Sequence, residues 1–280
     1  MRIMTTGSDL AGADDRARVR AYHDLSTHRL DRFAPGPETL DWDSQPDPFR
    51  NFAGARRTPL PLSADGLTTG FADLSRPGAV APAPLSLDSL ALLLELSLGV
   101  SAWKAQGPDR WALRCNPSSG NLHPTEAYVI AGGVPGLADG VHHYDSHSHG
   151  LEQRCAAGLA QPGMWIGLGS VHWREAWKYG TRGFRYCQLD TGHALGALRC
   201  ATARPRLAGA QRWSRDLTMP PWASCWAPTA QPILPASRRR TPKPCWSCHR
   251  AAPCRTAAGF RFCISGSGPE RQAFWTHTRS

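Results

Sequence analysis

Two stretches of the chain repeat apolar residues at helical spacing. In the first, Ser86 can cap a helix and Gly99 can end it, and the face between them carries Leu87, Leu90, Leu94 and Leu98. The second stretch, residues 174–199, is interrupted, and its register holds Phe184, Cys187, Thr191, Leu195 and Leu198. Both patterns predict helices that bury one face in a core.

The second helix also carries small and polar residues. Gly192 and Gly196 stand one turn apart on one face, where the lack of side chains would let another backbone approach closely. Asp190 and His193 flank that face. We expect both to be hydrogen-bonded polar groups of the core, because buried polar groups need partners.

Strand patterns lie between the two predicted helices. Residues 125–131 alternate and place Tyr128 and Ile130 on one face. Residues 141–144 and 151–154 predict a hairpin around the turn SHSHG. That turn region carries four histidines, which we interpret as solvated rather than as a metal site, because no cluster of Cys, Asp or Glu frames them.

The N-terminal part of the chain lacks such periodicity. Residues 1–20 are polar, and we expect them to be disordered. Residues 22–50 are rich in Asp, Pro and aromatic side chains and favour an ordered, irregular wrap rather than a helix. Its expected anchors are Phe33, Trp42 and Phe49.

Charge divides the chain sharply. Residues 201–280 hold 13 Lys/Arg and 2 Asp/Glu, whereas residues 1–200 hold 19 and 20. One interpretation is a basic arm for nucleic acid or another anionic surface, since Arg charge and Trp stacking would both serve there. The interpretation that we favour is an out-of-frame translation of a GC-rich gene, since this composition departs far from that of globular proteins. Residues 200–280 are then a disordered tail.

Other sequence features argue against export and against common cofactor motifs. The first twenty residues have no apolar segment typical of a signal peptide, and the apolar run 85–100 is interrupted by Asp88 and Glu95, so we expect a cytoplasmic protein without a membrane span. The glycines of residues 163–170 lack the spacing and context of a dinucleotide fingerprint. The motif CWSCH, residues 245–249, lacks the context of a haem or zinc site.

The stretch most suggestive of chemistry is residues 116–130, NPSSGNLHPTEAYVI, preceded by a polar loop and approach strand over residues 103–113. Pro117 fixes its own φ, and Gly120 admits the positive φ that directs successive N–H groups into one concavity. Such a concavity suits an anion or a polar ring edge. Further polar groups there are Ser118, Ser119 and Asn121, with Arg114 available for a phosphate. An ordinary Pro/Ser/Gly/Asn turn is the alternative.

Residues 114–130 resemble the flavin-contacting segment of the nitroreductase superfamily, whose usual form is Pro-Ser-x-x-Asn-x-Gln-Pro before a core strand. The similarity is greatest to the SagB/ThcOx branch, with His123 where many members have Gln. Further resemblance lies in YHDLSTH, LDWDSQPDPFR and WREAWKYGTRGFRYCQLDTGHALGALR. It covers about residues 20–199 and stops inside the second helical pattern.

The resemblance implies a nitroreductase-like α+β domain over residues 21–199, with a central, mainly antiparallel sheet flanked by helices. It implies FMN held by Arg114, Pro117, Ser118, Ser119, Gly120, Asn121 and His123. Lys178 and Tyr179 resemble the Lys-Tyr pair with which azoline-oxidising members remove a proton, although WREAWKYG is equally an ordinary amphipathic helix start. Members dimerise and exchange C-terminal segments, so losing the proper tail should weaken the dimer.

Three functions remain open. The first is an FMN-dependent oxidoreductase that transfers hydride to or from a small or peptide-borne substrate, with NAD(P)H as a candidate reductant. The second is a non-enzymatic remnant of such an enzyme without flavin. The third, an Arg-rich nucleic-acid binder, rests on the tail alone.

Overall fold

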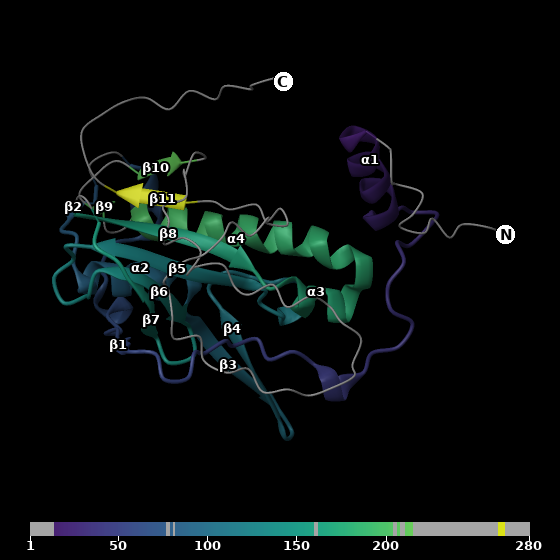
Figure 1. The fold of residues 1–280 in the computed structure, drawn as a ribbon, viewed down its shortest axis with the longest axis horizontal. Coiled ribbons are helices and arrows are strands. Elements are labelled where there is room, and N and C mark those ends of the chain that lie inside the picture. The colour runs from purple at the N-terminus through teal and green to yellow at the C-terminus, as the bar shows by residue number, and fades with distance from the viewer. Residues whose placement is uncertain are drawn as a thin grey trace, which may run out of the picture.

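The computed structural model describes residues 14–76, 79–80, 82–159, 162–203, 206–207, 211–214 and 263–266. Figure 1 shows a central sheet with helices lying along it, and α1 set apart from this body near the N-terminus. The expected α+β fold with a mainly antiparallel sheet is confirmed.

Seven described strands form the central sheet in the order β1-β7-β6-β5-β8-β11-β10. Their bounds are β1 Arg57–Pro59, β5 Thr125–Gly132, β6 Gly140–Asp145, β7 Gly150–Ala156, β8 Gly163–Ser170, β10 Gln211–Ser214 and β11 Cys263–Gly266. Every neighbouring pair in this sheet is antiparallel. The strand predicted at residues 125–131 is confirmed as β5, and the hairpin around SHSHG as β6 and β7.

Helices α2 and α4 pack on one face of this sheet. Ser86 caps α2, Leu87–Leu98, by accepting a hydrogen bond from the Ser89 N–H, as its sequence predicted. The second pattern is two helices, α3 His172–Tyr179 and α4 Gly183–Ala203, separated by the 3-10 turn η6, Gly180–Arg182. The main core joins α2 and α4 to the sheet through residues that include Leu90, Leu94, Val129, Ile166, Ala194 and Leu198.

The opposite face of the sheet carries a smaller apolar cluster and charged residues. Tyr128 and Ile130 share this face with Val141, as the alternation in β5 predicted. All eight residues of β5 are buried: α2 and α4 pack on one face, and the smaller apolar cluster lies on the other. A strand buried on both faces needs an internal partner for each of its polar side chains.

The N-terminal helix α1 spans Asp15–Ser26, so helical structure begins inside the stretch expected to be disordered. The reason is a cap: Asp14 accepts a hydrogen bond from the Ala17 N–H, which satisfies a free donor of the first turn. The Tyr22 hydroxyl donates to the Thr181 carbonyl and accepts from the Arg185 N–H. Tyr22 therefore attaches α1 to the bend between α3 and α4. Residues 1–13 lie outside the described part.

Three detailed expectations are wrong. Residues 103–113 form most of a hairpin, β3 Val100–Gln106 with β4 Asp109–Arg114, rather than a loop and one strand. Phe33 and Trp42 do not anchor the irregular segment, since their side chains are 82% and 63% exposed. No other group approaches Gly192 or Gly196 within 4 Å of where a Cβ would stand, so the close backbone approach is absent among the described residues.

The remaining elements are short. They are η2 Trp42–Ser44, η3 Ala64–Gly66, η4 Phe71–Ser75, η5 Ser119–Asn121, and the parallel pair β2 Pro82–Ala83 with β9 Arg206–Leu207. Of the tail, the structure describes α4 to Ala203 and the strands β9, β10 and β11. CWSCH, residues 245–249, lies outside the described residues. Since most of residues 200–280 also lie outside the described residues, their out-of-frame origin stays a hypothesis.

Candidate functional site

The turn over residues 116–123 has a left-handed backbone at three positions. Gly120 has φ 64°, Asn121 φ 60° and His123 φ 48°. The positive φ expected at Gly120 is confirmed, and two non-glycine residues share the conformation, which costs free energy for residues with a Cβ. Such strain persists only where surrounding contacts hold the turn.

Asp190 on α4 supplies those contacts. Its carboxylate accepts hydrogen bonds from the Ser118 hydroxyl at 2.6 Å, the Ser119 hydroxyl at 3.1 Å and the Ser119 N–H at 3.1 Å. Asp190 is 1% exposed, which confirms it as a hydrogen-bonded core residue, whereas His193 is exposed and that expectation for it is wrong. The Ser118 and Ser119 hydroxyls thus shape the turn from inside the protein.

His123 is buried and neutral at this turn. Asn121 donates from Nδ2 to the Ala112 carbonyl, so its Oδ1 accepts from His123 Nε2 at 2.9 Å. That tautomer leaves His123 Nδ1 as an acceptor that is buried and has no hydrogen-bond partner in the described part of the chain. Burial, together with the charges of Arg114 and Arg174, lowers the pKa of His123 to about 3. The site therefore presents an uncharged acceptor at Nδ1.

Lys178 and Tyr179, at the end of α3, lie directly against Gly120. A Cβ on Gly120 would stand 2.6 Å from the Tyr179 hydroxyl and 3.1 Å from Lys178 Nζ. The fold thus places the sequence-predicted proton-transfer pair beside the sequence-predicted cofactor turn, although more than fifty residues separate them in the chain. The hydroxyl and the amine share one small region of the surface.

A buried carboxyl group, that of Glu175, precedes Lys178 and Tyr179 on α3. It is 0% exposed, and neither carboxyl oxygen has a well-formed hydrogen bond among the described residues. Burial and then the charge of Asp190 raise the pKa of Glu175 to about 8. Its carboxyl is therefore mostly neutral at pH 7. Sequence reasoning missed Glu175, and its position three and four residues before Lys178 and Tyr179 was the available signal.

Arg114, predicted to face a phosphate, has protein partners. Its guanidinium donates to the Pro48 carbonyl at 2.6 Å and lies 5.2 Å from the centre of the Phe49 ring. Burial, together with the charge of Arg174, lowers the pKa of Arg114 to about 10, and the charge of Glu126 offsets only part of this effect. Of the three expected anchors of residues 22–50, Phe49 alone is not exposed.

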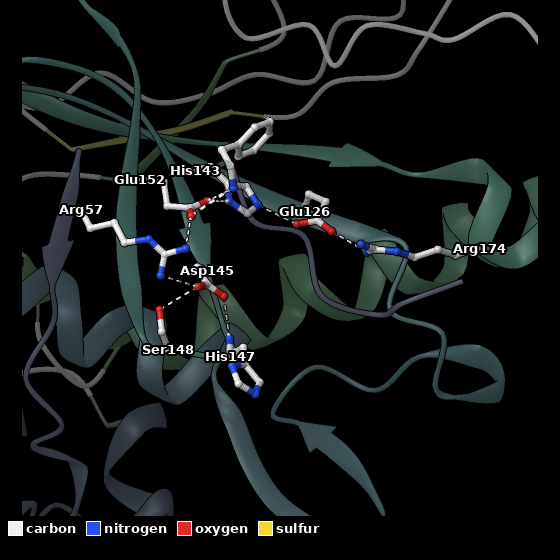
Figure 2. A network of polar contacts seen from close by, with 9 residues as sticks. Arg57, Glu126, His143, Asp145, His147, Ser148, Glu152 and Arg174 are labelled. Carbon is white, nitrogen blue, oxygen red and sulfur yellow. Dashed lines mark hydrogen bonds and ion pairs between the residues drawn. The ribbon is translucent and has the colours of Figure 1, made fainter. Parts of the chain in front are cut away.

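A chain of charged groups crosses the sheet on the face of Tyr128 (Figure 2). His143 on β6 bonds to Glu126 on β5 through Nε2 at 2.8 Å and to Glu152 on β7 through Nδ1 at 3.0 Å. Glu126 also pairs with Arg174 of α3, and Glu152 with Arg57 of β1. Burial alone would raise the pKa of Glu126, but His143 and Arg174 outweigh it and lower the pKa.

This charged network corrects the interpretation of the histidine-rich hairpin. His142, His143 and His149 are buried and hydrogen-bonded, and His147 alone is exposed as expected for a solvated turn. Register was the missed signal, since a hairpin around SHSHG places His143 opposite Glu152. Among the described residues no group of three His, Cys, Asp or Glu side chains is arranged to hold a metal ion.

Arg174 links this network to the site. The guanidinium donates to the His123 carbonyl at 2.6 Å and to Glu126. It therefore fixes the left-handed residue His123 against the central sheet. An open hollow of about 400 Å³ lies beside Arg174, lined by Pro46, Asp47, Phe49, Arg50, Asn51, Val171 and Trp173. None of the predicted cofactor residues of the turn lines it.

Known proteins share this fold and part of this sequence. The chain is 29% identical over 126 residues to a candidate nitroreductase of Methanocaldococcus jannaschii, across 39% of this chain and 59% of that protein. Its structure is similar to a candidate nitroreductase of Anabaena variabilis, with a TM-score of 0.53 and 25% identity over 69% of this chain and 39% of that one. Another candidate nitroreductase, from Ralstonia eutropha, aligns with a TM-score of 0.42 and 18% identity over 58% and 78% of the two chains.

The sequence and the fold are thus similar to those of the nitroreductase superfamily. No protein-family model matches the chain. The match spans about three fifths of the Methanocaldococcus protein and two fifths of the Anabaena chain. No helix among the described residues is long and apolar enough to cross a membrane.

Proposed function

We propose that this chain is an FMN-dependent oxidoreductase of the nitroreductase superfamily, of SagB/ThcOx type. The observation that carries the proposal is the position of the Lys178–Tyr179 pair directly against Gly120 of the 116–123 turn. A flavin supplies the electron-transfer chemistry when bound, and the protein supplies orientation and proton transfer. The similarity to candidate nitroreductases in sequence and fold supports this class of reaction.

The polar groups of the turn fit such a cofactor. His123 Nδ1 and Asn116 Oδ1 are buried acceptors that no described residue donates to, and a flavin ring carries N–H groups that could donate to acceptors of this kind. Ser118, Ser119, Asn121 and Pro117 would hold the shape of the turn, with the two serines fixed by Asp190. Arg114 would have to exchange its bond to the Pro48 carbonyl in order to reach a phosphate.

Lys178 and Tyr179 would move a proton while hydride passes between substrate and cofactor. Burial, followed by the charge of Glu175, raises the pKa of Tyr179, so its hydroxyl is a proton donor at neutral pH. Two nearby cationic side chains have other partners: Arg174 bonds to Glu126, and Arg185 to Ser26 and Thr27 of the α1 region. The substrate would be a small molecule or a peptide-borne group, with NAD(P)H as a candidate reductant.

We also propose that the exposed face of α4 is where a second copy of the chain binds. Leu189 is 51% exposed and Phe184 is 42% exposed on this helix, and the space above Gly192 and Gly196 is open. Large exposed apolar side chains beside two glycines favour a close helix contact. The tail should weaken this dimer if residues 200–280 are out of frame.

A visible absorption scan of the purified full chain tests the proposed function. Yellow protein with the bands of a bound flavin, or uptake of added FMN, is the expected result. Colourless protein that FMN does not reconstitute would favour the second candidate, a remnant without flavin. Binding of the full chain to nucleic acid without flavin would favour the Arg-rich tail as the functional part.

The coding DNA tests the origin of the tail. A one-base shift near codon 200 should restore a continuation rich in Leu, Ala and Asp/Glu that resumes the helical pattern of α4. If neither alternative frame encodes such a continuation, the tail is a genuine segment, and the pairing of β11 with β8 becomes part of the native fold.

A further inference from the structure

The charge environment of the Lys178–Tyr179 pair depends on two buried carboxyl groups. Glu175 lies on α3, three residues before Lys178 and four before Tyr179, which places it on the same side of the helix. Asp190 faces it from α4. The two helices pack tightly beside Glu175, since a Cβ on Gly183 at the start of α4 would stand 2.9 Å from the Glu175 carbonyl carbon.

The two carboxyl groups differ in their hydrogen bonds. Asp190 accepts from two hydroxyl groups and one N–H of the turn, and these donors stabilise its charged form. Glu175 is fully buried and has no such donors on either oxygen. Burial, followed by the charge of Asp190, raises the pKa of Glu175 to about 8, so Glu175 holds its proton at neutral pH.

Glu175 acts electrostatically on the pair at Gly120. An ionised Glu175 would oppose ionisation of the Tyr179 hydroxyl and attract the Lys178 ammonium. Tyr179 also faces Tyr186, Arg182 and Asp190, and Glu175 also faces Cys187. The guanidinium of Arg182 lies 5.5 Å from the centre of the Tyr179 ring. Its positive charge lowers the pKa of the Tyr179 hydroxyl, whereas the negative charge of Glu175 raises it.

We propose that Glu175 is a positioning residue for the Lys178–Tyr179 pair. Its neutral carboxyl leaves Asp190 as the buried negative charge beside the pair, and its ionised form adds a second negative charge that holds Tyr179 protonated and attracts the Lys178 ammonium. The assignment of a proton-transfer role to the pair rests on the proposed function, but the coupling between Glu175 and Tyr179 is a property of the folded chain. The pair would therefore respond to pH through a residue that touches neither substrate nor cofactor.

Carbon-13 labelling of tyrosine tests this coupling in the full chain, because the chain has five tyrosines and NMR can follow each ring. Tyr179→Phe identifies the resonance of Tyr179. In Glu175→Gln, which keeps the size of the side chain but not its titration, Tyr179 should ionise at a lower pH than in the unmodified chain. The exposed Glu38→Gln variant is the matched control and should leave the Tyr179 titration unchanged.

An unchanged Tyr179 midpoint in folded Glu175→Gln would overturn the proposal. Should that variant not fold, infrared spectroscopy of the unmodified chain decides instead. A protonated-carboxyl band at pH 7 that disappears with a midpoint near pH 8 is expected, and its absence at pH 7 would contradict the assignment. Neither readout requires flavin or turnover. A colourless protein that shows the Tyr179 shift would therefore contradict the proposed function and still support the coupling between Glu175 and Tyr179.

Discussion

The Tyr179 hydroxyl lies 2.6 Å from the position that a Cβ on Gly120 would occupy. This proximity joins the end of α3 to the 116–123 turn and leaves room for glycine alone. Any larger residue at position 120 would have to displace the Tyr179 ring or the Lys178 side chain. The turn and the Lys178–Tyr179 pair are therefore expected to respond together to substitution.

Gly120→Ala should abolish flavin binding and reduce stability, because it adds both backbone strain and a collision with Tyr179. Gly107→Ala is the matched control, because Gly107 has φ 58° but open space around its Cβ position. This substitution should reduce stability through backbone strain alone, by about 1 to 2 kcal/mol. Thermal unfolding and FMN titration of the two variants separate the effects. Equal losses in both would mean that the contact with Tyr179 is unimportant.

The same comparison can be made with larger changes. Gly120→Val should also eliminate flavin binding, whereas His147→Ala, at the one exposed histidine of the SHSHG turn, should leave it intact. Equal effects of these two substitutions on FMN binding would indicate that residues 116–123 are an ordinary turn.

His143→Gln should destabilise the fold strongly, because it leaves Glu126 and Glu152 without the group that joins them. Removing one partner of a buried hydrogen bond costs about 1 to 3 kcal/mol, and more where the group left behind is charged. Arg18→Ala is the contrasting variant, since its pair with Asp15 is exposed and worth about 0 to 1 kcal/mol. Denaturant unfolding measures both, and a loss below 1 kcal/mol for His143→Gln would show that the charged network is dispensable.

Acid should destabilise the protein in part through His123. Its pKa is lowered to about 3 in the folded state. Below about pH 6.5, therefore, the histidine of the unfolded chain is protonated while that of the folded chain stays neutral. This contribution to stability is complete above pH 6.5 and declines as the pH falls toward 3. His123→Gln, which cannot titrate, should reduce the loss of unfolding free energy between pH 6.5 and pH 4. An identical slope in the variant would contradict a buried neutral His123.

Gly192→Ala and Gly196→Ala distinguish a free α4 face from one that a second copy covers. In an isolated chain each should raise stability by about 1 kcal/mol, because alanine favours helix and the Cβ meets nothing. In a dimer with close backbone contact the added methyl groups should instead weaken association. Sedimentation and thermal unfolding together test this, and an unchanged dimer with stabilised subunits would place the interface elsewhere.

The sequence by itself predicted the elements whose pattern is local. The leucine spacing with Ser86 and Gly99 defined α2, and the alternation in residues 125–131 defined β5, because side chains that share a face recur at the fixed period of a helix or a strand. Gly120 and Pro117 marked the turn because few residues tolerate its backbone. The resemblance of residues 114–130 and 173–199 to a known superfamily then supplied the fold class.

Tertiary structure alone decided which distant groups meet. Glu126, His143 and Glu152 belong to three strands; the hairpin register places His143 opposite Glu152, but only the packed sheet shows that β5, which carries Glu126, lies beside β6. Glu175 and Asp190 likewise lie on different helices: Asp190 bonds to Ser118 and Ser119, whereas burial and the charge of Asp190 raise the pKa of Glu175. Burial and the identity of a neighbour are properties of the packed chain, and they determine which of the polar residues visible in the sequence carry charge.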